Sequence, residues 1–155
     1  MSLLDFITNK PVLIGLHLGF AIIGIDAFFW VAGEIIAKAN HALRMKLASL
    51  IGVAAFAASW LFGGYYYVVY YGSQVKPIIK SGLAPWAHLI VMEAKEHIFL
   101  FILPLAITVT LAAFLSKEDF IGLRRSVLLV TILILSLGLA IGIMGFIISA
   151  AARWG

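Results

Sequence analysis

Long apolar runs separated by short polar stretches dominate the hydropathy pattern of this chain. Four runs are long enough to cross a bilayer, which takes roughly 20 apolar residues in a helix. The pattern therefore predicts an all-α integral membrane four-helix bundle in one transmembrane domain, residues 1–155. The four transmembrane helices are expected at about residues 11–38, 46–72, 85–115 and 125–152.

The predicted connections are the polar stretches between these runs. The basic segment 38–46 follows the first span, and segment 72–84 is the longest connection, rich in turn-forming Gly, Ser and Pro. Segment 116–125 opens with Ser116-Lys117-Glu118-Asp119 and ends with two arginines. We expect these three segments to lie outside the hydrocarbon.

Composition narrows the class further. The chain is 64% hydrophobic and 12% charged, and its mean hydropathy is +1.13, whereas soluble domains contain about 25% charged residues. Cysteine is absent, which excludes disulfides, thiol chemistry and cysteine-ligated clusters. The basic residues stand at loop ends, so we expect the lipid bilayer as partner and no nucleic acid. Other membrane subunits or a homo-oligomer remain open as protein partners.

The distribution of basic residues predicts the orientation of the bundle. With four spans, both termini fall on one side, which carries four Lys and Arg residues against six on the other side. Because short cytoplasmic loops carry the excess of positive charge, we expect the termini outside and the protein in the cell membrane.

Ionisable residues interrupt the apolar runs at two places. His17 and Asp26 lie inside the first span, and Asp26 has to be within the membrane because residues 11–25 are too short to cross it. At about 100° per residue, Asp26 points roughly opposite His17, toward another neighbour or a second protomer. A structural hydrogen bond is the alternative reading for Asp26.

The third span opens with Met92-Glu93-Ala94-Lys95-Glu96-His97. Charged groups near hydrocarbon are costly and usually face a bundle interior, a cavity or each other. Counted from Pro11 and Pro85, His17, His88, Glu93 and His97 lie at similar depth, beside the tyrosines at 65–67 and 70–71. Two other readings stand beside a functional site: an ordinary charged helix entry at the water boundary, and an aromatic belt.

Haem b is the first chemistry that this pattern favours. Two histidines on different helices at matched depth can ligate a haem iron from both sides. His17 with His97 is the preferred pair, and His17 with His88 is the second. The predicted function is redox or electron transfer, as an oxidoreductase or electron-transport protein, and whether the protein is an enzyme stays open. Glu93, Lys95 and Glu96 are the candidate catalytic residues, serving propionates, protons or a bound substrate.

The same spans resemble a group of haem-binding membrane proteins. The matching residues are Leu16-His17 and Gly24, then Gly63-Gly64-Tyr65, then Pro85-Trp86-Ala87-His88 with Lys95. This pattern is similar to the four-helix group that includes the copper-resistance D family and the HemJ-type protoporphyrinogen oxidases. The resemblance implies haem association for His17 and for His88 or Lys95. Glu93 and Glu96 depart from the group's pattern.

A transition-metal site is the second reading of these residues. Glu93 and His97 are four residues apart on one helix, and His17 or Glu96 could complete a mixed oxygen and nitrogen shell. The predicted metal ligands are His17, His97 and Glu93.

Two further readings need no cofactor. Asp26, Glu34, Glu93 and Glu96 could relay protons or ions through the membrane. Alternatively, the chain is an accessory subunit of a larger membrane complex, a reading that the glycines of the fourth span also fit. Phosphate loops and the Gly-x-Ser-x-Gly elbow of hydrolases are absent from the sequence.

Overall fold

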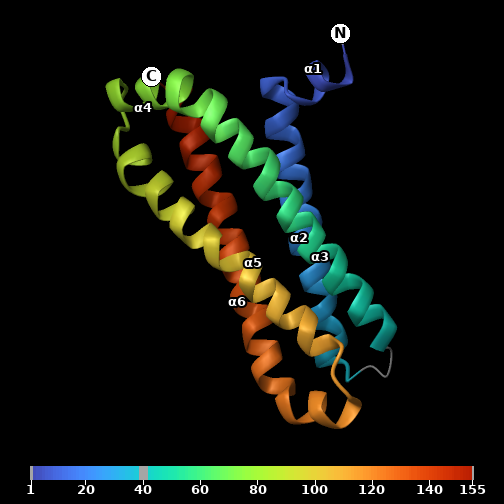
Figure 1. Cartoon of the computed structure of the whole chain (residues 1–155). Helices are drawn as coiled ribbons and strands as arrows, with labels where there is room; N and C mark the ends of the chain where they lie inside the picture. Colours follow the sequence, from blue (N-terminus) through green and yellow to red (C-terminus); the bar gives the residue numbers. More distant parts are fainter. Residues whose placement is uncertain (1, 39–41, 155) are drawn as a thin grey trace.

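The computed structural model describes residues 2–38 and 42–154, and in this part of the chain it contains helices and no strand. Four of these helices are long and apolar enough to cross a membrane, which confirms the all-α bundle and a multi-pass membrane protein (Figure 1). The candidate spans are Lys10–Ile36, Leu43–Ser81, Ala87–Ala113 and Lys117–Ala151.

The second and third spans are each built from more than one kind of helix. The α-helix α3 continues without a break into a π-helix, η1, and then into the short helix α4; the π-helix η2 leads directly into α5. The elements in order are α1 (Leu3–Ile7), α2 (Lys10–Ile36), α3 (Ala42–Tyr66), η1 (Tyr67–Val75), α4 (Lys76–Ser81), η2 (Ala87–Met92), α5 (Glu93–Ala113) and α6 (Lys117–Ala151).

The N-terminal lead-in forms a capped helical turn. Ser2 accepts a hydrogen bond from the Asp5 backbone N–H, and the Asp5 carboxylate accepts one from Ser2, so both ends of a capping box are present. These hydrogen bonds from Ser2 lower the pKa of the Asp5 carboxyl below its usual value. Helix α2 then begins with Pro11 in its first turn, where a missing N–H costs nothing.

Helical structure continues into all three predicted connections. Segment 72–84 is helical as far as Ser81, and Pro77 fits there because it stands in the first turn of α4. Helix α3 already begins at Ala42, and residues 39–41 lie outside the described residues. Helix α6 begins at Lys117, where the Ser116 hydroxyl accepts from the Asp119 N–H at 3.2 Å. Charged residues stop a transmembrane run but not a helix.

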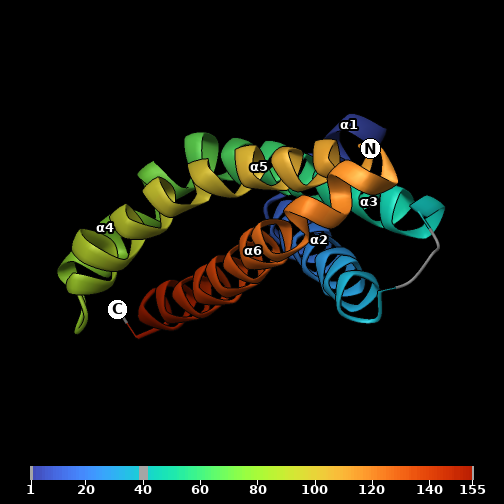
Figure 2. The same cartoon turned by 90° about the horizontal axis from the view of Figure 1, so that it is seen from below.

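The helices form a four-cornered bundle with both termini at one end (Figure 1). Helix α2 packs against α3 and α6, and α5 packs against the same two helices, so α2 and α5 occupy opposite corners (Figure 2). At the end with the termini, η1, α4 and η2 pack together and η2 contacts α6.

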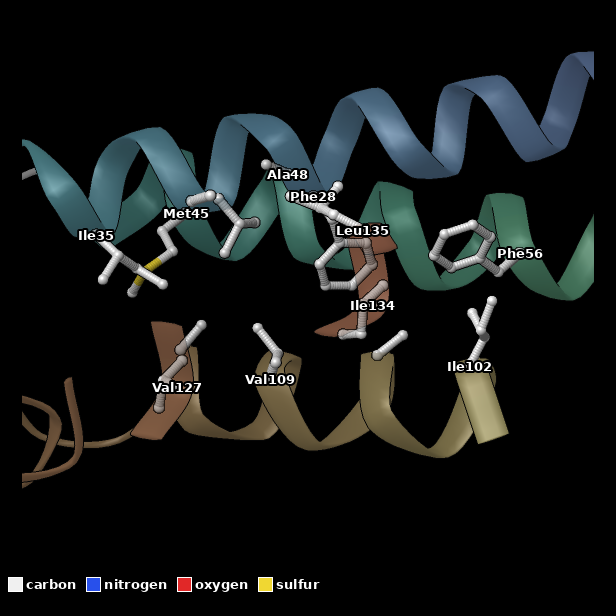
Figure 3. Packing of buried hydrophobic residues seen from close by; sticks show 14 of the residues in the cluster. Phe28, Ile35, Met45, Ala48, Phe56, Ile102, Val109, Val127, Ile134 and Leu135 are labelled. Carbon is white, nitrogen blue, oxygen red and sulfur yellow. The ribbon is translucent and has the colours of Figure 1, made fainter. Parts of the chain in front are cut away.

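The half of the bundle away from the termini, called the apolar half here, contains a continuous hydrophobic core contributed by all four spans (Figure 3). Two glycines make room for aromatic rings between α2 and α3. A Cβ at Gly24 would lie 2.6 Å from the Phe56 ring, and a Cβ at Gly52 would lie 2.5 Å from the Phe28 ring. Each ring thus fits against a glycine of the other helix, and the two rings stack at 5.7 Å.

The far end of the apolar half is closed by two basic residues. The Arg124 guanidinium donates from Nε to the Ile35 carbonyl at 3.0 Å, in addition to the hydrogen bond that this carbonyl accepts from the Lys38 N–H at the end of α2. The Lys46 ammonium lies 5.0 Å from the centre of the Phe114 ring, which ties α3 to the end of α5.

Candidate functional site

Two π-helices face each other at the end of the bundle that carries the termini. Tyr71 of η1 and His88 of η2 are each only 2% exposed, and the Tyr71 hydroxyl lies 3.0 Å from His88 Nδ1. Segments of π-helix are rare and are found frequently at functional sites. The half of the bundle around this pair, called the polar half here, is therefore the candidate functional site.

Glu96 places a carboxylate oxygen inside the polar half. Its Oε1 atom is buried and has no hydrogen-bond partner, and it is the one side-chain atom of that kind among the described residues. The Tyr67 hydroxyl lies beside this carboxylate. An unpaired buried acceptor costs about 1–3 kcal/mol, so the Glu96 oxygen marks a candidate binding position for a hydrogen-bond donor.

Lys95 also turns toward the bundle interior. It is partly buried, and its Nζ atom is 3.9 Å from where a Cβ would stand at Gly145 of α6. Glu96 is the next residue of α5, and the structure records no ion pair between the Lys95 ammonium and the Glu96 carboxylate within the described residues.

His17 is fixed against α3 by Ser59. His17 Nδ1 lies 2.9 Å from the Ser59 carbonyl and 3.0 Å from its hydroxyl, while that hydroxyl donates to the His17 carbonyl at 2.9 Å. Since a carbonyl only accepts, Nδ1 carries the proton and a neutral imidazole keeps its lone pair on Nε2. Gly63 makes room for the ring, because a Cβ there would be 2.5 Å from Nδ1.

Glu93 and His97, by contrast, are exposed. His97 Nδ1 lies 2.6 Å from the Glu93 carbonyl of its own helix, so its ring is held along the surface of α5. The predicted cluster at 93–97 is therefore divided: Lys95 and Glu96 face the interior, and Glu93 and His97 face outward. The structure records no contact between His17 and His97.

The described ranges contain no group of three or more His, Cys, Asp or Glu side chains placed to hold a metal ion. The predicted ligand set of His17, His97 and Glu93 is accordingly not assembled in this conformation. An apolar groove of about 200 Å³ opens near the end of α6, and it includes none of the predicted site residues. Its lining residues are Ala84, Trp86, Phe146, Ile147, Ala150, Ala151 and Trp154.

The acidic residues of α2 lie apart from this site. Asp26 is exposed on the outer surface of α2, and Glu34 accepts a hydrogen bond from Trp30 Nε1 at 2.9 Å. The predicted relay of Asp26, Glu34, Glu93 and Glu96 is therefore not one connected group of carboxylates.

Ser59 is a site residue that the sequence did not predict, although it stands four residues before Gly63 and thus on the same helix face. Tyr71 belongs to the tyrosines that the sequence places beside the site, and its burial distinguishes it from the exposed Tyr65.

No protein-family model, curated protein or solved structure matches this chain. The resemblance to the four-helix haem-binding group therefore stays a prediction, which the side chains of the polar half have to support.

Proposed function

We propose that this membrane protein handles protons at an intramembrane site formed by Glu96, Lys95 and His17, which is reached from the side of the termini. The observation that carries the proposal is the buried Glu96 oxygen without a partner. An ionisable group placed near hydrocarbon is expensive, and such groups mark proton and ion pathways in membrane proteins.

A line of protonatable side chains supports this assignment. It starts at His88, which bonds Tyr71 at 3.0 Å, and the Tyr71 ring stacks on Tyr67 at 5.2 Å. Tyr67 lies beside Glu96, Lys95 is the neighbouring residue of α5, and His17 of α2 is held by Ser59. The line crosses the polar half and ends at Ser59.

The apolar half closes the other end of this path. Ile102, Val109 and Ile134 are at most 2% exposed, and a core of this kind offers no partner for a proton. Protons therefore load from the side of the termini, and they cross the bundle only when the helices rearrange. This makes the proposed activity a gated transfer rather than an open channel.

Proton flux into lipid vesicles tests the proposal. Vesicles containing the protein and a trapped pH-sensitive dye should dissipate an imposed pH gradient faster than empty vesicles. Glu96→Gln should bring the rate down to that of empty vesicles, because the amide cannot release a proton. Glu93→Gln is the matched control, since Glu93 is exposed on the same helix, and should keep the flux. Equal rates for Glu96→Gln and the unmodified protein would contradict the proposal.

Haem b binding is a second candidate, favoured by the geometry of His17. A histidine that ligates a metal usually donates its other ring N–H to a carbonyl or carboxylate, and His17 does this toward Ser59. The donor chemistry fits for the His17 imidazole with the partly buried Lys95 amine, which would hold the iron, whereas His97 would have to turn inward from the surface of α5 to serve as the second ligand. A haem bound there would supply one-electron transfer.

Absorption spectroscopy of the purified protein tests this second candidate. Supplied with haem, the unmodified protein should show a Soret band that sharpens on reduction with dithionite. His17→Ala should remove that band, and comparison of Lys95→Met with His97→Ala identifies the second ligand by which of them changes the spectrum. A Soret band that survives His17→Ala would exclude the ligand assignment, and a colourless protein would exclude haem.

A further inference from the structure

One face of α2 is directed away from the bundle, and the residues on this face recur with a regular spacing. Its residues recur at alternating intervals of four and three positions, the repeat of a left-handed coiled coil. They are all exposed or partly exposed, and they lie opposite the buried face that includes Leu13, Phe28 and Val31. This set, called the α2 stripe here, is Gly15, Gly19, Ile22, Asp26, Phe29 and Gly33.

Packing inside the bundle does not explain the glycines of the α2 stripe. A Cβ at Gly15, Gly19 or Gly33 would meet nothing within 4 Å. Gly24 on the opposite face is different, because a Cβ there would press on the Phe56 ring. Glycines spaced by four on an open transmembrane face allow a second helix to approach closely.

Asp26 supplies an observation that is independent of the glycines. It stands sixteen residues after Lys10 and ten before Ile36, which places it roughly 24 Å and 15 Å from the two ends of the helix. The carboxyl group is exposed there, and the structure gives it no hydrogen bond or ion pair within the described residues. Glu34 on the same helix already has Trp30 as a partner, so Asp26 is the unsatisfied acid of this face.

We propose that the α2 stripe binds the α2 stripe of a second copy of this chain, with the two Asp26 side chains facing each other. Copies of one chain insert with one topology, so their α2 helices run parallel and each stripe residue meets its own counterpart. Two carboxyl groups at one depth can share a proton in a hydrogen bond, which satisfies both without any further residue. A different partner would need its own donor at this depth.

Cysteine cross-linking in vesicles tests the contact, and the chain is suited to it because it contains no cysteine. Single variants Ile22→Cys and Phe29→Cys should form disulfide-linked dimers on mild oxidation. Ile143→Cys is the control, since Ile143 is 62% exposed on α6, and it should stay monomeric. Equal cross-linking at all three positions, or none at 22 and 29, would overturn the proposal.

The role of Asp26 is tested in the Ile22→Cys background. Asp26→Leu should reduce cross-linking roughly fivefold or more, whereas Asp26→Asn should retain it because the amide both donates and accepts. Gly19→Ile should block dimer formation, and Gly142→Ile should not, since Gly142 is equally open but belongs to α6. All these positions are open to lipid, so helix content measured by circular dichroism should stay constant. Cross-linking that is unaffected by Asp26→Leu and Gly19→Ile would refute the contact. A different polypeptide that co-purifies with the chain, when the chain itself forms no cross-linked dimer, would also refute it.

Discussion

The two halves of the bundle use the same packing device for different purposes. In the apolar half, Gly24 and Gly52 admit the Phe56 and Phe28 rings, and the result is a closed hydrocarbon core. In the polar half, Gly63 admits the imidazole of His17 in the same way. A glycine facing a ring thus builds rigidity where the ring is apolar and positions a reactive nitrogen where it is not.

The halves also differ in how completely their polar groups are satisfied. The buried hydroxyls of Thr110 and Thr131 in the apolar half each donate to a carbonyl of their own helix. The polar half leaves Glu96 Oε1 without a partner. Stability of the bundle does not explain why the Glu96 oxygen is unpaired, whereas the proposed site for protons or a cofactor would explain it.

The largest expected effect is in the apolar half. Gly52→Ala places a methyl group 2.5 Å from the Phe28 ring, which is fully buried and cannot move aside. We expect a loss of about 3 kcal/mol in the free energy of unfolding, measured by thermal or denaturant unfolding in detergent. Gly64→Ala is the matched control on the same helix, with open space around it, and should be neutral or slightly stabilising. Equal stability of the two variants would contradict the close fit.

Removing the hydroxyl between the π-helices should have the next largest effect. Tyr71→Phe leaves the buried Nδ1 of His88 without its partner, at an expected cost of about 2 kcal/mol. Tyr65→Phe, at an exposed tyrosine, should leave the unfolding midpoint unchanged. A neutral Tyr71→Phe would mean that water or another group satisfies His88.

A smaller loss of stability is expected for Gly63→Ala, with a larger effect on function. The added methyl displaces the partly exposed His17 ring, for about 1 kcal/mol, and breaks its contact with Ser59. Every signal that depends on His17, whether proton flux or a Soret band, should then fall toward the level of His17→Ala. If Gly63→Ala keeps the full signal, the function does not depend on the observed position of the His17 ring.

The smallest effect tests the closure of the apolar half. Arg124→Gln removes one hydrogen bond to the Ile35 carbonyl, which keeps its bond from the Lys38 N–H, and should lower stability by about 0.5 kcal/mol. Arg125→Gln is the control, since Arg125 is exposed next to it, and should change the unfolding free energy little. Identical behaviour of the two variants would indicate that the Lys38 N–H alone satisfies the Ile35 carbonyl.

The spans could be predicted from the sequence because burial in lipid requires long apolar runs, and the four runs are nearly uninterrupted. The helix starts at Pro11 and after Pro85 followed from the same pattern. Helix ends were less predictable: Gly72, Ser73 and Pro77 are turn formers, yet they lie in continuous helix. Outside the hydrocarbon, packing against η2 decides whether such a segment stays helical, and this contact cannot be predicted from the sequence pattern.

The candidate site was predicted in outline and not in detail. The convergence of the third span with the tyrosines followed from comparing depths, and the Tyr71–His88 contact joins those two elements. The separation of Glu96 from Glu93 and His97 did not follow, because it depends on how α5 is rotated against its neighbours. A helical wheel at 100° per residue also fails across η1 and η2, where the π-helical turn is wider.

The reciprocal fit of Phe28 with Gly52 and of Phe56 with Gly24 has a consequence for how this protein can move. Sliding α2 along α3 by even one residue would drive both rings into neighbouring side chains, so this pair is a fixed frame. The opening that the proposed gated transfer requires would then come from α5 and α6 shifting against that frame. Spin labels on α2 and α5 should report a change in separation between states, while labels on α2 and α3 should keep theirs.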